Sequence, residues 1–200
     1  MNFLAHLYLS GDNEEIITGN FIADHVKGGS VMKFSYGIQL GIKLHREIDA
    51  FTDAHPVFLK SKQRLNGNYR RYAGVVADMF YDHFLSADWQ TYSKENLMDF
   101  TDRIHDILIK RFPILPERSQ RFIAYMKRFN WLTGYGTFDG LGRALNGMAI
   151  RTPFNSGMEN AVKDLRKDYE LYKQEFEEFF PEIFDFSRNL LSDLDFNLMR

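Results

Sequence analysis

Two segments of the chain combine histidines and carboxylates at helical spacing. His45 and Asp49 lie four residues apart in LHREID, and Asp78 and Asp82 lie four apart in VADMFYDHFL, where His83 follows directly. Residues four apart share one face of a helix, so each pair could bind one metal ion or take part in proton transfer.

The ligand chemistry is restricted by the absence of cysteine, which excludes thiolate metal sites. Carboxylates suit Mn²⁺ and Mg²⁺, and imidazole is tolerated by Mn²⁺ and Fe²⁺. A divalent ion with open coordination positions can activate water. Asp24, in GNFIADHVKGG, is a further candidate of this kind.

Both segments also have an interpretation without a metal. His45, Arg46 and Asp49 could form ion pairs on a solvated helix face, which is the commoner role of an isolated spacing of this kind. Asp78 and Asp82 lie among apolar residues, so their charges need partners. An ion pair with Arg46 or Arg71 would supply one without catalysis, and the two roles can coexist.

The remaining histidines are weaker candidates. His6, in FLAHLYL, has apolar neighbours on both sides, which favours a hydrogen-bonded core histidine over a functional one. His25 precedes a glycine pair that ends its helix and could interact with the helix dipole, so we leave it out of the ligand set. His55 and His105 are interpreted as surface or capping residues.

The elements that must position these residues are helices. Apolar residues recur at three- and four-residue spacing along most of the chain, and alternating strand patterns are scarce. No linker, repeat or low-complexity segment divides the sequence, so we predict one all-α domain over residues 1–200, a helical bundle. Helices are expected near 3–9, 13–27, 31–52, 56–65, 69–87, 93–111, 117–131, 140–149 and 158–179, with breaks at 66–68 and Pro181 and a tail helix after Pro181.

Composition narrows the class of protein. The chain has 27 acidic and 25 basic residues and a formal charge of −2, which argues against a protein that binds nucleic acid by neutralising phosphates. No segment approaches the roughly 20 apolar residues of a membrane span, and the first residues lack the basic start of a signal peptide. We therefore expect a cytoplasmic protein without a membrane partner; its oligomeric state is not predicted.

Several motifs together resemble the acyl carrier protein phosphodiesterase family. They occur in order over most of the chain, and such a string is more specific than any single motif. The motifs are NFLAHL at 2–7, GNFIAD at 19–24, GIKLHREIDAFTDAHP at 41–56, RRYAG at 70–74, DMFYDHFL at 78–85 and LNGMAIR at 145–151.

The resemblance implies an HD-domain-like, all-helical phosphohydrolase. Such an enzyme uses a divalent ion, usually Mn²⁺ with Mg²⁺ or Fe²⁺ as alternatives, to remove 4′-phosphopantetheine from the serine of holo-acyl carrier protein. On this interpretation the metal ligands are Asp24, His45, Asp82 and His83.

The same interpretation assigns catalytic roles to four further residues. Asp49 or Asp78 would orient the attacking water or take its proton. Arg46 and Arg71 would bind the phosphate oxygens, because a forked guanidinium suits that geometry.

A basic segment lies between the two histidine–carboxylate segments. From Ala54 to Ala77 there is no acidic residue, while five basic ones occur there: Lys60, Lys62, Arg64, Arg70 and Arg71. Carrier proteins are acidic, so this segment could dock the substrate. The alternative is a solvated basic loop around Asn66.

Two other classes of function are compatible with the same residues. One is a phosphohydrolase that acts on a small nucleotide or another phosphodiester, because a metal site does not itself specify a carrier protein. The other is a non-catalytic helical binding protein whose buried charges are structural. Activity on free nucleotides would favour the first, and a metal-independent protein without hydrolase activity would favour the second.

Overall fold

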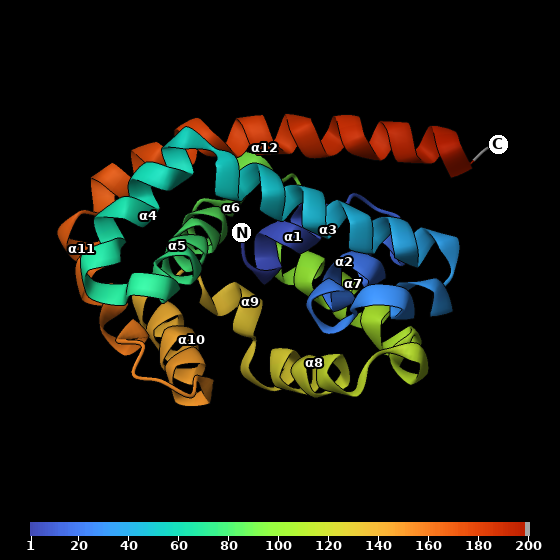
Figure 1. The fold of residues 1–200 in the computed structure, drawn as a ribbon, viewed down its shortest axis with the longest axis horizontal. Coiled ribbons are helices and arrows are strands. Elements are labelled where there is room, and N and C mark those ends of the chain that lie inside the picture. Colours follow the sequence, from blue (N-terminus) through green and yellow to red (C-terminus); the bar gives the residue numbers. More distant parts are fainter. Residues whose placement is uncertain (199–200) are drawn as a thin grey trace.

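The structure, a computed structural model, describes residues 1–198, without the side chains of residues 128, 129 and 194–198. The described chain is all-α, as predicted, and contains no strand (Figure 1). Its α-helices are α1 (Phe3–Tyr8), α2 (Glu14–Ile22), α3 (Tyr36–Ala54), α4 (Pro56–Tyr69), α5 (Ala73–Ala87), α6 (Trp89–Tyr92), α7 (Leu97–Lys110), α8 (Glu117–Phe129), α9 (Trp131–Gly134), α10 (Phe138–Arg151), α11 (Ala161–Lys167) and α12 (Tyr169–Leu198). Short 3₁₀ turns join several of them, including η1 (Ala23–His25), η2 (Gly28–Lys33) and η3 (Arg70–Tyr72).

Several predicted helix boundaries are wrong; the helix expected over 158–179, for example, is divided at Asp168 between α11 and α12. The break expected at Pro181 is absent, because α12 continues through it while the neighbouring Phe180 and Ile183 are buried in the core. The expected loop at 66–68 is helical, since the chain leaves α4 only at Arg70, where φ is +48°. The helix expected from residue 31 starts later, at Tyr36, after the η2 turn.

The helices α2 and α3 approach each other closely at two glycines. A Cβ atom on Gly19 would lie 2.0 Å from the carbonyl oxygen of Ile38, and one on Gly41 would lie 2.2 Å from that of Ile16. No other residue type fits such a backbone-to-backbone contact. The pair therefore fixes α3, with His45, against α2.

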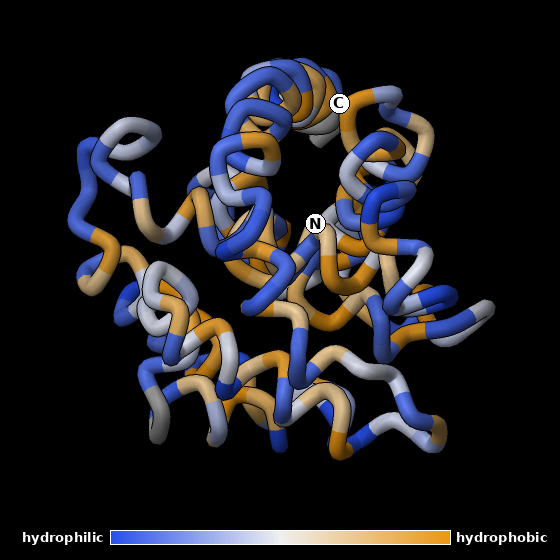
Figure 2. The backbone as a smooth tube through the Cα atoms, turned by 90° about the vertical axis from the view of Figure 1, so that its left-hand side faces the viewer, coloured by the Kyte–Doolittle hydropathy of each residue, from blue (hydrophilic) through white to orange (hydrophobic). Residues whose placement is uncertain are grey.

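Helix α5 lies in the interior and carries some of the largest buried side chains, such as Tyr81, Phe80 and Phe84. Phe176 and Phe179 of α12 pack against Tyr81. Figure 1 shows α12 along one edge of the molecule, α8 and α10 along the opposite edge, and α1 between them. Polar and apolar residues alternate along most helices (Figure 2), as expected when one face of each helix is buried.

No helix in the described part of the chain is both long and apolar enough to cross a membrane.

Candidate active site

Two histidines and two aspartates from α1, η1 and α3 meet at one point. The Nε2 atom of His6 lies 3.1 Å from Oδ1 of Asp49. The Nε2 atom of His45 lies 3.2 Å from Oδ2 of Asp49 and 3.4 Å from Oδ1 of Asp24. The rings of His6 and His45 are stacked, with their centroids 4.0 Å apart. We call these four residues the N-terminal cluster.

The spacing of these atoms fits a divalent cation. Ligand bonds of about 2.0–2.3 Å at angles of about 90–110° put neighbouring ligand atoms about 2.8–3.8 Å apart. The three distances within the N-terminal cluster fall in this range. One ligand atom each from His6, His45 and Asp49 lies within 4.8 Å of the others, so these three could hold one ion, with Asp24 at its edge.

Without a cation, the same atoms form a network of ion pairs. Burial lowers the pKa of His45, but the two carboxylates outweigh it and raise that pKa to about 9. The two histidines in turn hold the pKa of Asp49 well below its usual range despite its partial burial. His6 has its pKa lowered to about 4 by burial and by the charge on His45. His45 is therefore an imidazolium at neutral pH, whereas His6 is neutral.

The N-terminal cluster is open on its carboxylate side. The two imidazoles are buried, but the side chains of Asp24 and Asp49 are 66% and 45% exposed. A ligand that enters from solvent therefore meets the carboxylates first, and a cation bound between them and the rings would keep a face towards water.

Two predicted ligands interact with other parts of the fold. The carboxylate of Asp82 is fully buried and accepts hydrogen bonds from the backbone N–H groups at the start of α1, those of Asn2, Leu4 and Ala5. The Nδ1 atom of His83 lies 2.7 Å from the carbonyl oxygen of Tyr135, and the His83 ring stacks on Phe138.

Asp82 and His83 have hydrogen-bond partners outside the N-terminal cluster, and their role as metal ligands stays a prediction. Burial raises the pKa of Asp82 to about 7 and lowers that of His83. Neither joins the three-residue metal-binding group found in the described chain. Asp82 holds α1, and with it His6, in position.

The other predicted catalytic residues each have a partner outside the N-terminal cluster. Oδ1 of Asp78 pairs with the Met1 ammonium at 2.7 Å, and that ammonium also interacts electrostatically with Asp49. Arg46 donates to the carbonyl oxygen of Val26 at 3.3 Å. The charges of Asp78 and Asp82 do have partners, as expected. These are the Met1 ammonium and the start of α1, rather than Arg46 or Arg71.

Arg71 is exposed to solvent and lies against two aromatic rings. Its guanidinium lies 4.5 Å from the ring centroid of Phe154 and 5.8 Å from that of Tyr72. The structure therefore shows Arg71 stacked on aromatic rings beside α5, and its role in binding phosphate stays a prediction.

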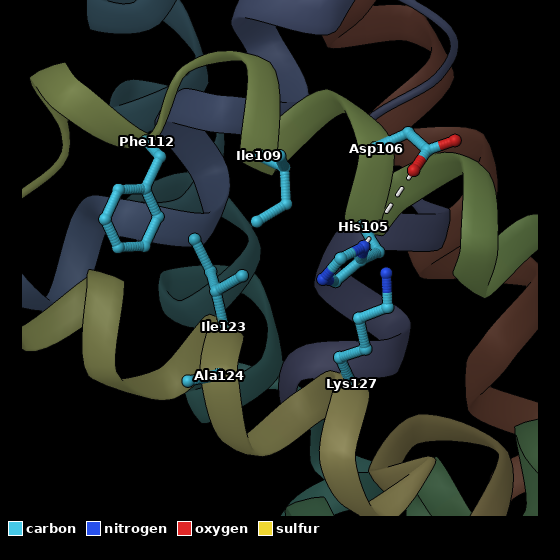
Figure 3. A pocket seen from close by; sticks show the side chains of 7 residues that line it. All are labelled: His105, Asp106, Ile109, Phe112, Ile123, Ala124 and Lys127. Atoms are coloured by element: carbon cyan, nitrogen blue, oxygen red, sulfur yellow. Dashed lines mark ion pairs between the residues drawn. The ribbon is translucent and has the colours of Figure 1, made fainter.

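A pocket of about 450 Å³ lies between α7 and α8 (Figure 3). Its lining is apolar at one end, with Ile109, Phe112 and Ile123, and polar at the other, with His105 and Lys127. It contains none of the predicted site residues. We place the candidate site at the N-terminal cluster because only there do ligand atoms of several predicted residues converge.

His6 is the one member of the N-terminal cluster that the sequence interpretation set aside. It is buried, as expected of a core residue, but its Nε2 atom faces Asp49. Its apolar neighbours cover the rest of α1, so the only local signal was a lone polar group in an otherwise apolar helix.

The fold and this cluster define an all-α protein with a candidate divalent-cation site, of the kind found in metal-dependent hydrolases. The profile of the family described as "Acyl carrier protein phosphodiesterase" matches residues 1–183. Proteins of that name are similar to nearly the whole chain. The one from Photorhabdus laumondii is 32% identical over 94% of this chain and 96% of its own length, and the one from Escherichia coli O6:H1 is 34% identical over 92% and 96%. No solved structure matches. The chain belongs to the acyl carrier protein phosphodiesterase family.

Proposed function

We propose that this phosphodiesterase cleaves 4′-phosphopantetheine from the serine of holo-acyl carrier protein at the N-terminal cluster. The carrying observation is the convergence of imidazole and carboxylate ligand atoms from His6, His45 and Asp49 at one solvent-facing point. Family membership supports the reaction and the substrate.

In this proposal, His6, His45 and Asp49 hold a divalent cation, with Asp24 as a fourth ligand. A bound divalent cation supplies Lewis-acid activation of water and neutralises charge on the phosphate oxygens. The donor set of imidazoles and carboxylates suits Mn²⁺ or Fe²⁺, with Mg²⁺ as a weaker alternative.

Two further groups border this site. Asp78 is held by the Met1 ammonium, and burial raises its pKa while that ammonium opposes the shift. We assign Asp78 the role of accepting a proton from the attacking water, because its carboxylate interacts electrostatically with Asp49 without belonging to the cluster. Arg46, exposed on α3 one residue from His45, would bind phosphate oxygens.

Docking of the acidic carrier protein is assigned to α4 and η3. The structure divides the basic residues there into two groups. Arg64 donates two hydrogen bonds to Glu175, and Lys62 pairs with Asp53 at 3.4 Å, so part of their charge is compensated. Lys60 and Arg70 are exposed and form no ion pair within the described residues. These two are the cations best placed to attract a partner.

The test is direct. Purified protein is incubated with holo-acyl carrier protein and Mn²⁺, and mass spectrometry follows loss of the phosphopantetheine arm. Release of the arm in the presence of the ion, and none after chelation, is the expected result. Hydrolysis of free nucleotides with an intact holo-carrier would instead favour a small-molecule phosphodiesterase.

A further inference from the structure

Asn20 of α2 contacts both histidines of the N-terminal cluster, the ring of His45 and the backbone of His6. Its side chain is buried, with 1% of the residue exposed. Its Oδ1 atom is 2.9 Å from Nδ1 of His45. Its Nδ2 atom donates to the carbonyl oxygen of His6 at 3.0 Å and to Oγ of Ser10 at 2.8 Å. One amide thus contacts both α1 and α3.

These partners leave Asn20 only one orientation. The carbonyl oxygen of His6 can only accept, so the atom of Asn20 that faces it must be the amide nitrogen. The amide oxygen then faces His45, and because that oxygen also can only accept, Nδ1 of His45 must carry a proton. The hydroxyl of Ser10 donates to the same carbonyl of His6, so every hydrogen of this group has an acceptor.

The tautomer of His45 follows from this orientation. A neutral imidazole has one N–H group and one lone pair, so a proton held on Nδ1 leaves the lone pair on Nε2. Nε2 is the atom that faces Asp24 and Asp49. The lone pair is therefore presented where a cation would bind.

We propose that Asn20 is a positioning residue of the metal site, which fixes the ring of His45 and its Nδ1–H tautomer so that Nε2 can ligate. This inference rests on the proposed function, because it assumes a cation at the N-terminal cluster. Partners of this kind, which hold the second ring nitrogen of a ligating histidine, tune metal affinity about 10- to 100-fold.

The backbone contact of α2 with α3 makes this reach possible. Asn20 follows Gly19, and its backbone nitrogen lies close to Gly41 of α3. Since His45 is one helical turn beyond Gly41, the short side chain of Asn20 spans the gap to its ring.

The rival role is structural, with Asn20 serving only to tie α1 to α2. Three variants separate the two. Asn20→Leu removes every hydrogen bond, Asn20→Asp keeps an acceptor for His45 but loses the donor to His6, and Ser10→Ala weakens the tie to α1 without touching His45.

Mn²⁺ affinity of the whole protein is measured by isothermal titration calorimetry, with thermal unfolding alongside. We expect Asn20→Leu to weaken Mn²⁺ binding about 10-fold or more. Asn20→Asp and Ser10→Ala should lose thermal stability but bind Mn²⁺ within about threefold of wild type, because the partner of Nδ1 is retained. Equal affinity of wild type and Asn20→Leu would overturn the inference and leave the metal site intact.

A second readout does not need the metal. Two-bond ¹H–¹⁵N spectra of the metal-free protein, at a pH at which the His45 ring is neutral, report which ring nitrogen carries the proton. The wild type should show the Nδ1–H tautomer, and Asn20→Leu should lose it in favour of Nε2–H. A wild type with the Nε2–H tautomer would overturn the inference. Failure of wild-type protein to bind Mn²⁺ would count against the proposed function.

Discussion

His6 and His45 stack with an angle of 20° between their rings, yet they have opposite protonation preferences. Burial and the neighbouring charge lower the pKa of His6 to about 4, while two carboxylates raise the pKa of His45 to about 9. At neutral pH the His6 ring is neutral, whereas the His45 ring would have to lose a proton before it could ligate a cation. If the pair binds a cation as proposed, binding should depend on pH.

Substitution of His6 tests whether it is a ligand or only a core residue. We expect His6→Gln to weaken Mn²⁺ binding by at least about 10-fold, because a ligand is lost. His105→Gln, which also replaces a buried histidine, is the control and should leave the affinity unchanged. Calorimetric titration of both variants gives the answer; undiminished Mn²⁺ affinity in His6→Gln would return His6 to a structural role.

The stability of the metal-free protein should depend on pH through the protonation of His45. Its pKa rises from 6.5 to about 9 on folding, so its contribution to stability is complete below pH 6.5 and is lost as the pH rises through about 9. Mn²⁺ binding should show the opposite trend and tighten by up to about 10-fold per pH unit below that pKa, because a proton is released. Thermal unfolding with and without Mn²⁺ between neutral pH and pH 9 measures both. In His45→Gln both dependences should be smaller.

Substitution of Asp82 tests whether this residue holds α1 in place or binds the cation directly. Asp82→Asn places an amide against backbone N–H groups that need an acceptor, so we expect a loss of about 1–3 kcal/mol in the free energy of unfolding. Mn²⁺ affinity of the folded variant should fall much less than that of Asp49→Asn. Urea unfolding and calorimetry are compared for the two. Unchanged stability with abolished Mn²⁺ binding would instead make Asp82 a ligand.

The close contact of α2 and α3 predicts a sharp difference between two glycines. Gly41→Ala puts a methyl group 2.2 Å from the carbonyl oxygen of Ile16, and a backbone atom cannot move aside, so the cost should be about 1–3 kcal/mol or more. Gly67→Ala, in α4, meets nothing within 4 Å and should stabilise the protein by up to about 1 kcal/mol. Urea unfolding of both variants is the measurement, and equal effects would contradict the packing described for α2 and α3.

If α4 and η3 dock the carrier protein, charge reversal there should affect the hydrolysis of a large substrate and not that of a small one. Reversing Lys60 and Arg70 to Glu should raise KM for holo-acyl carrier protein and reduce its salt dependence, while hydrolysis of a small phosphodiester stays unchanged. Arg64 is left intact because its loss would break the pair with Glu175. Lys94→Glu with Lys127→Glu is a control of equal charge outside this segment. Equal losses on both substrates would argue against docking.

The local pattern of the sequence predicted helix α3 and the shared face of His45 and Asp49, because both depend on residues four apart. It could not indicate contacts that join distant residues. A buried carboxylate such as Asp82 can face either a cation or the N–H groups at a helix start. Its contacts lie 77–80 residues away, beyond any local pattern.

The same reason explains the other differences. The sequence near Pro181 suggested a break, but packing of the residues around it against α5 and α4 keeps α12 continuous. His6 was interpreted from its apolar neighbours, whereas its Nε2 atom faces Asp49 of α3. Helix propensity and periodicity therefore predicted most helices, but they did not predict the contacts between helices.

The hydrogen bonds from α1 to Asp82 have a consequence for the order in which the protein matures on the ribosome. All members of the N-terminal cluster emerge within the first 49 residues. A six-residue helix cannot persist alone in water, so α1 acquires its shape only after the acceptor at position 82 has been synthesised. A nascent chain that ends before α5 would contain the four residues of the N-terminal cluster without their arrangement. On the proposed function, cation binding would therefore wait until α5 is in place.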